Sequence, residues 1–230
     1  MVNMTFDFER VFRQLTPFLL DAVQVTVYVS VVSIVLGMIV GLISCLMVIG
    51  RFRVLRILAE AYVWVIRGTP MIVQALLFFF GINSIFLQLG WTFRFTPVNA
   101  GILTVTLNAG AYFTEIFRAG IAAVDKGQNE AARSLGLTPW KAMYKVILPQ
   151  ALRISLPPTV NQWIISTKDT AILSIIGVGE LTNLTQVYAF GQFVFFESFI
   201  YVAFWYLAIL SVLMILAKKL EKWVSYDRKN

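Results

Sequence analysis

The sequence predicts an all-α membrane protein with five transmembrane helices, the N-terminus outside and the C-terminus in the cytoplasm. Of its 230 residues, 59% are hydrophobic and only 13% are charged, and the mean hydropathy is +0.78. A soluble domain of this size carries roughly 25% charged residues, so the composition indicates a chain that lies mostly in lipid. The apolar runs are too long and continuous for the alternating strands of a membrane barrel.

Five segments are long enough to cross a bilayer, because a membrane-spanning helix needs about 20 mostly apolar residues. The first and the last contain no charged residue, whereas the three between them contain ionisable residues. The five segments are residues 22–49, 57–82, 97–122, 155–180 and 198–217. Before them, residues 6–18 are expected to form either an interfacial helix or a disordered tail on the outer surface.

The distribution of lysine and arginine sets the expected orientation. Cytoplasmic loops of membrane proteins carry an excess of these residues. Basic clusters occur at 51–56 and 118–153 and again in the tail from Lys218, whereas the opposite side has only Arg10, Arg13 and Arg94. The first side is therefore predicted to be cytoplasmic. The net charge of +7 is explained by this topology rather than by binding of nucleic acid.

Several kinds of chemistry are excluded by what the sequence lacks. There is no histidine, and the single cysteine, Cys45, lies in an apolar run, which excludes disulfides, His/Cys zinc sites and a Cys/His catalytic pair. No GxxxxGK[ST] phosphate-binding loop occurs, so any energy from ATP must come from another subunit. We therefore expect no metal site, no cofactor bound by this chain and no enzymatic activity of the chain alone.

The longest predicted cytoplasmic loop, residues 123–153, carries signals for two short helices. Residues 130–135 are good helix formers, and Gly136 suits a left-handed C-terminal cap. Thr138 suits an N-cap, and Pro139 the first helical position. We expect Pro149 to end the second helix, because a proline removes a hydrogen bond there. Glu130 is expected in the first turn of the first helix, where a carboxylate complements the helix dipole.

The second of these helices is predicted to have one apolar face. Trp140, Met143, Val146 and Ile147 recur at spacings of three and four. The segment could be an amphipathic connector on the membrane surface, or a docking element that fits a groove on a soluble partner. A DNA-binding helix-turn-helix is a remote third interpretation. Helix pattern alone leaves the first two open.

Ionisable residues inside the predicted spans are functional candidates, since a charge near the middle of a bilayer costs roughly 2.5–3.5 kcal/mol. They could pair with each other, with Arg67 or Arg118 joined to Glu115, or they could line a polar path for a zwitterionic substrate. The glycine pair Gly37 and Gly41 favours close helix packing, and Gly177 suits a helix stop. The charged candidates are Arg67, Glu115, Lys168 and Asp169.

The cytoplasmic loop resembles the signature of ABC importer permeases. Glu130-Ala131-Ala132, Gly136 and Leu148-Pro149 stand where that signature has them, with Val146 in place of its isoleucine. Further segments resemble the polar amino-acid branch of these permeases, the histidine, glutamine and arginine type: RGTPMIVQ (67–74), AYFTEIFRAGIAAVDKGQ (111–128) and KDTAILSIIGVGELT (168–182). The resemblance covers nearly the whole chain.

The resemblance implies a type I ABC importer permease fold, with residues 1–230 as one transmembrane domain in the bacterial inner membrane. It implies two ATPase subunits that hold ATP and Mg²⁺, a second permease subunit that is identical or homologous, and an extracytoplasmic binding protein that delivers an amino acid. The loop 123–153 would hold coupling helices that dock on the ATPase. The coupling residues carried over or predicted beside them are Glu130, Ala131, Ala132, Gly136, Leu137, Thr138, Trp140 and Met143.

Because the charged motifs are shared by permeases with varied substrates, we assign Arg67, Glu115, Lys168 and Asp169 to gating or structure. Neutral polar residues are better candidates for contact with substrate. Asn108 and Tyr112, and likewise Thr170 and Ser174, are four apart and would share helix faces. The substrate-path candidates are Asn108, Tyr112, Asn161, Ser166, Thr170 and Ser174.

Two alternatives from other classes remain at this stage. An ion-gradient-driven secondary transporter or channel subunit also uses broken helices and buried charge, but it would need no ATPase. A membrane scaffold would have no use for buried charges. The residues do not identify the amino acid that is carried.

Overall fold

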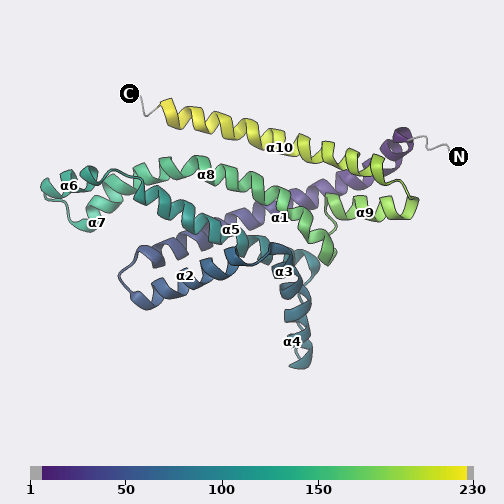
Figure 1. The fold of residues 1–230 in the computed structure, drawn as a ribbon, viewed down its shortest axis with the longest axis horizontal. Helices are drawn as coiled ribbons and strands as arrows, with labels where there is room; N and C mark the ends of the chain where they lie inside the picture. Colours follow the sequence, from purple (N-terminus) through teal and green to yellow (C-terminus); the bar gives the residue numbers. More distant parts are fainter. Residues whose placement is uncertain (1–6, 227–230) are drawn as a thin grey trace. The chain divides into compact units, whose positions relative to one another are not determined.

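The computed structural model describes residues 7–226, which are helical over most of their length (Figure 1). The helix predicted at 97–122 coincides with α5. The helices are α1 (Phe8–Ile49), α2 (Arg53–Gly68), α3 (Met71–Leu76), η1 (Leu77–Gly81), α4 (Ile82–Gln88), α5 (Pro97–Ala122), α6 (Lys126–Ser134), α7 (Pro139–Ala142), η2 (Met143–Ile147), α8 (Leu148–Asp169), η3 (Thr170–Ile176), α9 (Leu181–Gln192) and α10 (Phe195–Tyr226).

These helices form two compact units, each built from three separate stretches of the chain. The first unit contains the described part of Met1–Ile34 together with Thr69–Val105 and Ile165–Leu213. The second contains Val35–Gly68, Thr106–Ile164 and the described part of Met214–Asn230. Each unit is described below by itself.

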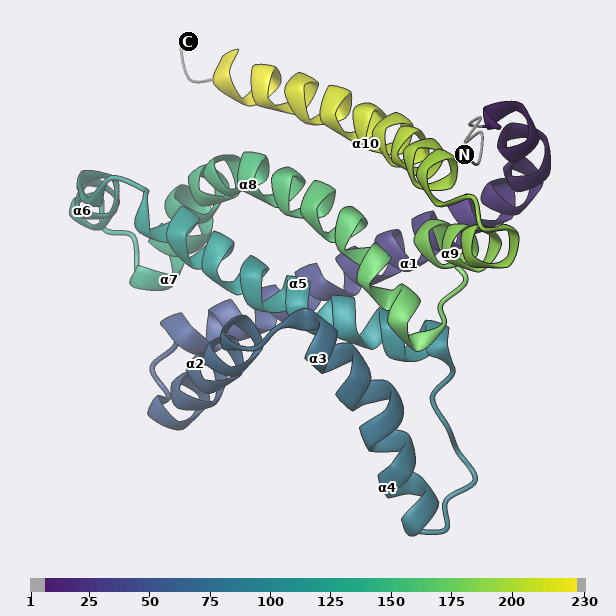
Figure 2. The same ribbon diagram turned by 45° about the vertical axis from the view of Figure 1, so that its right-hand side comes forward.

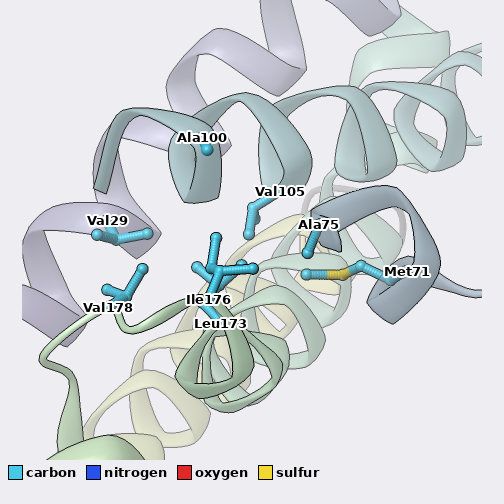
Figure 3. Packing of buried hydrophobic residues seen from close by; sticks show 8 residues of the cluster. All are labelled: Val29, Met71, Ala75, Ala100, Val105, Leu173, Ile176 and Val178. Carbon is cyan, nitrogen blue, oxygen red and sulfur yellow. The ribbon is translucent and has the colours of Figure 1, made fainter. Parts of the chain in front are cut away.

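The first unit is centred on a small apolar core that joins α1, α3, α5 and η3. Figure 3 shows that its side chains converge from these four elements and from the turn after η3. Gly101 lets η3 approach α5, because a Cβ there would lie 2.8 Å from Leu173 Cδ1. The buried members are Val29, Met71, Ala75, Ala100, Val105, Leu173, Ile176 and Val178.

The start of α1 packs into the same unit, which overturns the expected interfacial helix or tail at 6–18. Residues from Phe8 onward belong to one 42-residue helix, and Phe6 lies outside the described residues. Val11, Leu15 and Leu19 are almost completely buried, in a cluster with Leu181 and Val202. Burial of these side chains against α9 and α10 favours a continuous helix over a surface-bound one.

The predicted second span, 57–82, is interrupted at Pro70, as the sequence Arg67-Gly68-Thr69-Pro70 within it indicates. The chain breaks at Thr69 and Pro70, where Pro70 has an extended backbone with φ −62° and ψ 134°. Proline lacks the N–H that a helix interior needs, and it forces the preceding residue out of the helical region. After the break, α3, η1 and α4 follow one another without interruption, as Figure 2 shows.

The predicted fourth span, 155–180, has the wrong bounds at both ends, since α8 begins at Leu148 and η3 ends at Ile176. The prediction that Pro149 ends a helix is also wrong. η2 has π-helical geometry, in which the Leu148 N–H donates to Met143 O, and α8 continues from it through Pro149 to Asp169. The wider π turn leaves room for the proline ring, and it tolerates the hydrogen bond that is lost because proline has no N–H. The 3₁₀ helix η3 follows α8, and Gly177 then stops the helix at φ +80°, as predicted.

Three stretches of the described chain are long and apolar enough to cross a membrane by length and composition. They are Phe8–Ile49, Met71–Gln88 and Phe195–Leu220. The total of five spans and the orientation of the termini stay predictions.

In the second unit, α1 and α5 touch through glycines, which confirms the predicted role of Gly37 and Gly41 in close packing. A Cβ on Gly41 would lie 2.5 Å from Phe113 Cβ, and one on Gly37 would lie 3.1 Å from Ala109 Cβ. Helices in lipid gain contact area when small residues let their backbones approach.

We expect Gly41→Ala to destabilise the protein by about 1–3 kcal/mol, because the added methyl group must push α1 away from α5. The measurement is the thermal unfolding midpoint in detergent. Gly191→Ala is the control, since a Cβ at Gly191 of α9 meets no atom within 4 Å. Equal midpoints for the two variants would contradict the packing argument.

Candidate functional site

The segment that links α5 to α8 begins with α6, which starts earlier than predicted. The Asp125 side chain caps it by accepting a hydrogen bond from the Gly127 N–H at 2.7 Å. Because α6 runs from Lys126, Glu130 lies beyond its first turn, and the prediction that Glu130 complements the helix dipole there is wrong. Glu130 is exposed on the helix.

The turn after α6 confirms the predicted role of Gly136. Its φ is +81°, and two hydrogen bonds close the helix end: the Gly136 N–H donates to Arg133 O at 3.0 Å and the Leu137 N–H donates to Ala132 O at 3.2 Å. This pair of bonds is the Schellman motif. A side chain at such a φ costs about 1–2 kcal/mol, so glycine is favoured at this position.

The predicted start of the next helix is confirmed, while its predicted apolar face is divided. Thr138 caps α7 by accepting from the Lys141 N–H, and Pro139 is its first residue. Val146 and Ile147 pack with Met143 against Val124 and Ala151. Three large side chains are left on the surface instead: Leu135 is 85% exposed, Trp140 76% and Tyr144 62%.

A second feature of this unit is a polar cavity of about 450 Å³ between α2 and α5. It contains two carboxylates, one guanidinium and two aromatic rings, a mixture rare in the lipid-facing parts of a membrane protein. Arg67, Tyr112 and Glu115 were predicted as functional residues, and the structure brings them together here. The lining residues are Val48, Glu60, Val63, Trp64, Arg67, Gly68, Tyr112 and Glu115.

The charges around this cavity are unequally partnered. Arg118 donates to both carboxylate oxygens of Glu115, with Nη2 at 2.6 Å from Oε2, which confirms one of the two predicted pairings. Arg67 instead lies over the ring of Tyr112, at 5.1 Å from its centroid, in a cation–π contact.

The substrate-path candidates do not form one site within either unit. Asn108, Tyr112 and Asn161 belong to the second unit, whereas Ser166, Thr170 and Ser174 belong to the first. The prediction that Thr170 and Ser174 share a face is wrong, because η3 is a 3₁₀ helix with three residues per turn. Its buried residues are accordingly Thr170, Leu173 and Ile176.

The two predicted charged residues at the junction of α8 and η3, Lys168 and Asp169, differ in exposure. Lys168 is exposed at the end of α8, and Asp169 is partly exposed at the start of η3, where its side chain makes no capping bond.

Glu180, which is completely buried in the first unit, was not among the site residues predicted from the sequence. Its carboxylate caps α9 by accepting from the Asn183 N–H at 2.7 Å and the Thr182 N–H at 2.9 Å, and it accepts a third bond from the Tyr206 hydroxyl at 2.7 Å. A buried carboxylate is tolerated only when its oxygens are satisfied in this way. The signal was an acid within a predicted span, at the end of 155–180, and the same signal marks Glu60 within 57–82.

Comparison with known proteins identifies the family. Residues 33–226 match the family described as "Binding-protein-dependent transport system inner membrane component". The chain belongs to this family. It is therefore a multi-pass bacterial inner-membrane permease, a transport subunit and not an enzyme by itself.

Two curated relatives match almost the whole permease. The glutamine transport system permease protein GlnP of Escherichia coli strain K12 is 36% identical over 95% of this chain and 98% of its own. The arginine transport system permease protein ArtQ of Bacillus subtilis strain 168 is 34% identical over 95% of this chain and 97% of its own. Nothing in these matches supports an ion-gradient-driven transporter.

Solved structures confirm the fold of the permease. A chain from the structure titled "Crystal structure of an amino acid ABC transporter with histidines" matches with a TM-score of 0.88 and 36% identity, over 95% of this chain and 99% of that one. A chain of the MetNI methionine ABC transporter, at 20% identity and a TM-score of 0.71, shows the shared fold alone. The type I importer permease fold predicted from the sequence is thereby confirmed.

We expect Glu180→Ala to destabilise the permease by about 2–3 kcal/mol, because it removes a helix cap and one hydrogen-bond acceptor of the part-buried Tyr206 hydroxyl. Thermal unfolding in detergent measures this. Glu9→Ala is the control, since Glu9 forms an exposed pair with Arg13, which contributes little. The structural role of Glu180 would be contradicted if both variants unfolded at the wild-type temperature.

Proposed function

We propose that this permease imports a polar amino acid as part of an ATP-driven complex, and that the segment Lys126–Ile147 docks on the ATPase subunits. The single observation that carries the docking proposal is the construction of this segment. It has two capped helices around a left-handed glycine, and it leaves Leu135, Trp140 and Tyr144 exposed. Large apolar side chains in water are costly unless a partner covers them.

The alternative, in which the segment lies on the membrane as an amphipathic connector, is less consistent with these contacts. Such a helix needs one continuous apolar face toward lipid. Here Met143, Val146 and Ile147 are used against Val124 and Ala151 within the protein. The exposed residues lie around the glycine turn, which suits an anchor in a groove of a partner.

The coupling residues in this proposal are those expected from the sequence. Gly136 sets the angle between the helices, Ala132 is buried in the turn, and Glu130 is exposed for pairing with a cation of the ATPase. ATP and Mg²⁺ belong to that partner. The residues are Glu130, Ala131, Ala132, Gly136, Leu137, Thr138, Trp140 and Met143.

The proposed substrate class rests on the relatives, which are named for glutamine and arginine, and on the solved transporter with histidines. Asn108, Tyr112, Asn161, Ser166, Thr170 and Ser174 remain the proposed substrate path. Arg67, Glu115, Lys168 and Asp169 remain proposed gating or structural charges. A second permease subunit, identical or homologous, would complete the path, and a binding protein would deliver the substrate.

In the proposed topology, residues 1–230 form one permease domain with five spans. The N-terminus and the loop before α5 face the outside, and the segment Lys126–Ile147 and the C-terminus face the cytoplasm. This orientation puts the docking segment on the side where ATP is available.

We expect Gly136→Asp to leave membrane insertion intact and to abolish both transport and transport-coupled ATP hydrolysis. The measurement is uptake of L-glutamine, L-arginine or L-histidine by proteoliposomes that contain the permease, its ATPase and its binding protein. Gly90→Asp is a matched control, because Gly90 also has positive φ, +72°, and open space around it, as Gly136 does. Normal uptake by the Gly136 variant would disprove the docking proposal.

We also expect Trp140→Ala to weaken ATPase binding by tenfold or more, because buried aromatic anchors dominate such interfaces. The measurement is the dissociation constant between the detergent-solubilised permease and its ATPase. Trp91→Ala is the control, since Trp91 is similarly exposed but stacks on Phe86 in the loop before α5. Equal losses for the two variants would count against a specific anchor at Trp140.

A further inference from the structure

We propose that Glu60 and Arg67 of α2 form a binding site for the backbone of a free amino acid, with Glu60 holding the ammonium group and Arg67 the carboxylate. The site is the polar cavity between α2 and α5. This inference rests on the proposed function, which supplies the amino-acid substrate. It adds Glu60, which was not among the predicted site residues, and it gives Arg67 a role in binding rather than in gating.

Glu60 and Arg67 line the same cavity with opposite charges. Glu60 and Arg67 are seven residues apart, so their Cα atoms lie on one face of α2 and are separated by about two turns, or roughly 10 Å, along the helix. No ion pair joins them among the described residues. A zwitterion carries its ammonium and its carboxylate on one carbon, so it can bridge an anionic and a cationic side chain that do not contact each other.

Arg67 is held in a way that leaves its donors available. Its guanidinium lies over the Tyr112 ring, 5.1 Å from the centroid. No hydrogen bond from this guanidinium is found among the described residues, so its N–H donors are available in the cavity. The planar fork of an arginine matches the two oxygens of a carboxylate.

Glu60 is the carboxylate left to accept an ammonium. The other carboxylate of the cavity, Glu115, already accepts bonds from Nε and Nη2 of Arg118. Glu115 is thus largely neutralised, whereas Glu60 is exposed on the cavity wall. One free anion and one stacked cation match the two charges of an amino-acid backbone.

The cavity also has the size and lining for such a ligand. Its volume of about 450 Å³ falls within the range of roughly 300–1,000 Å³ typical of small-molecule sites. Trp64 and Tyr112 supply aromatic surface for the amino-acid side chain. In the proposed topology α2 starts at the cytoplasm, which makes this a site on the release side of the path.

The experiment is a competition assay on the purified permease–ATPase complex without binding protein. Radiolabelled L-glutamine, L-arginine and L-histidine are displaced by the unlabelled amino acid, by its N-acetyl form, which lacks the ammonium, and by its amide, which lacks the carboxylate. The variants are Glu60→Gln and Arg67→Gln. Arg53→Gln, at the opposite end of α2, is the control.

The expected result is a residue-specific loss of discrimination. The wild type should bind each analogue about tenfold or more weakly than the amino acid, because each analogue loses a charge-assisted hydrogen bond. Glu60→Gln should bind the amino acid about tenfold more weakly and lose the penalty against the N-acetyl form only. Arg67→Gln should lose the penalty against the amide only, and Arg53→Gln should behave as wild type.

A wild type that does not discriminate, or variants that keep both penalties, would overturn the inference. Uptake by the wild-type complex with its binding protein is measured in parallel. Uptake of one of the three amino acids together with unchanged penalties in the variants refutes this site and leaves the proposed function standing. Lack of uptake of all three refutes the proposed substrate class itself.

Discussion

The close approach of α1 and α5 is the constraint on which the second unit depends. Gly37 and Gly41 leave no room for a Cβ against α5, and a Cβ on Gly110 would lie 2.7 Å from the Tyr62 hydroxyl of α2. Tyr62 in turn donates to Leu107 O at 2.6 Å. α5 is thus held by α1 on one side and by α2 on the other. Tyr112 and Glu115 on α5 are fixed opposite Arg67 by backbone contacts rather than by the charges themselves.

A comparison of the acids separates structural from functional charge. Glu180 is buried and accepts three hydrogen bonds, so its charge is fully used inside the first unit. Both carboxylate oxygens of Glu115 accept bonds from Arg118 at the edge of the cavity. Glu60 is exposed on the cavity wall. Because charge in a membrane is costly, the acid with the fewest internal partners has the strongest claim to a ligand.

The sequence predicted best those features that depend on neighbours within one turn. Gly136, Thr138 and Pro139 were placed correctly because caps and left-handed turns are decided by local backbone chemistry. The sequence did not predict features that depend on unusual backbone geometry. The π turn before Pro149 cannot be recognised from the spacing of apolar residues in one sequence. The same is true of the 3₁₀ geometry that separates Thr170 from Ser174. The interruption of the second span at Pro70 was predictable, because a proline cannot continue a helix without a break or a kink.

The segment Lys126–Ile147 is joined to α5 and α8 by packed side chains as well as by the chain itself. Ile147 contacts Val124, just after α5, and Ala151 of α8. Ser155 of α8 donates to Ile116 O of α5 at 3.4 Å, at a point where Gly120 leaves no space for a side chain. A displacement of α6 and α7 would therefore move α5 and α8 together. Since α5 carries Tyr112 and Glu115, closure of a docked partner would reach the wall of the polar cavity through packed side chains, without any further moving part.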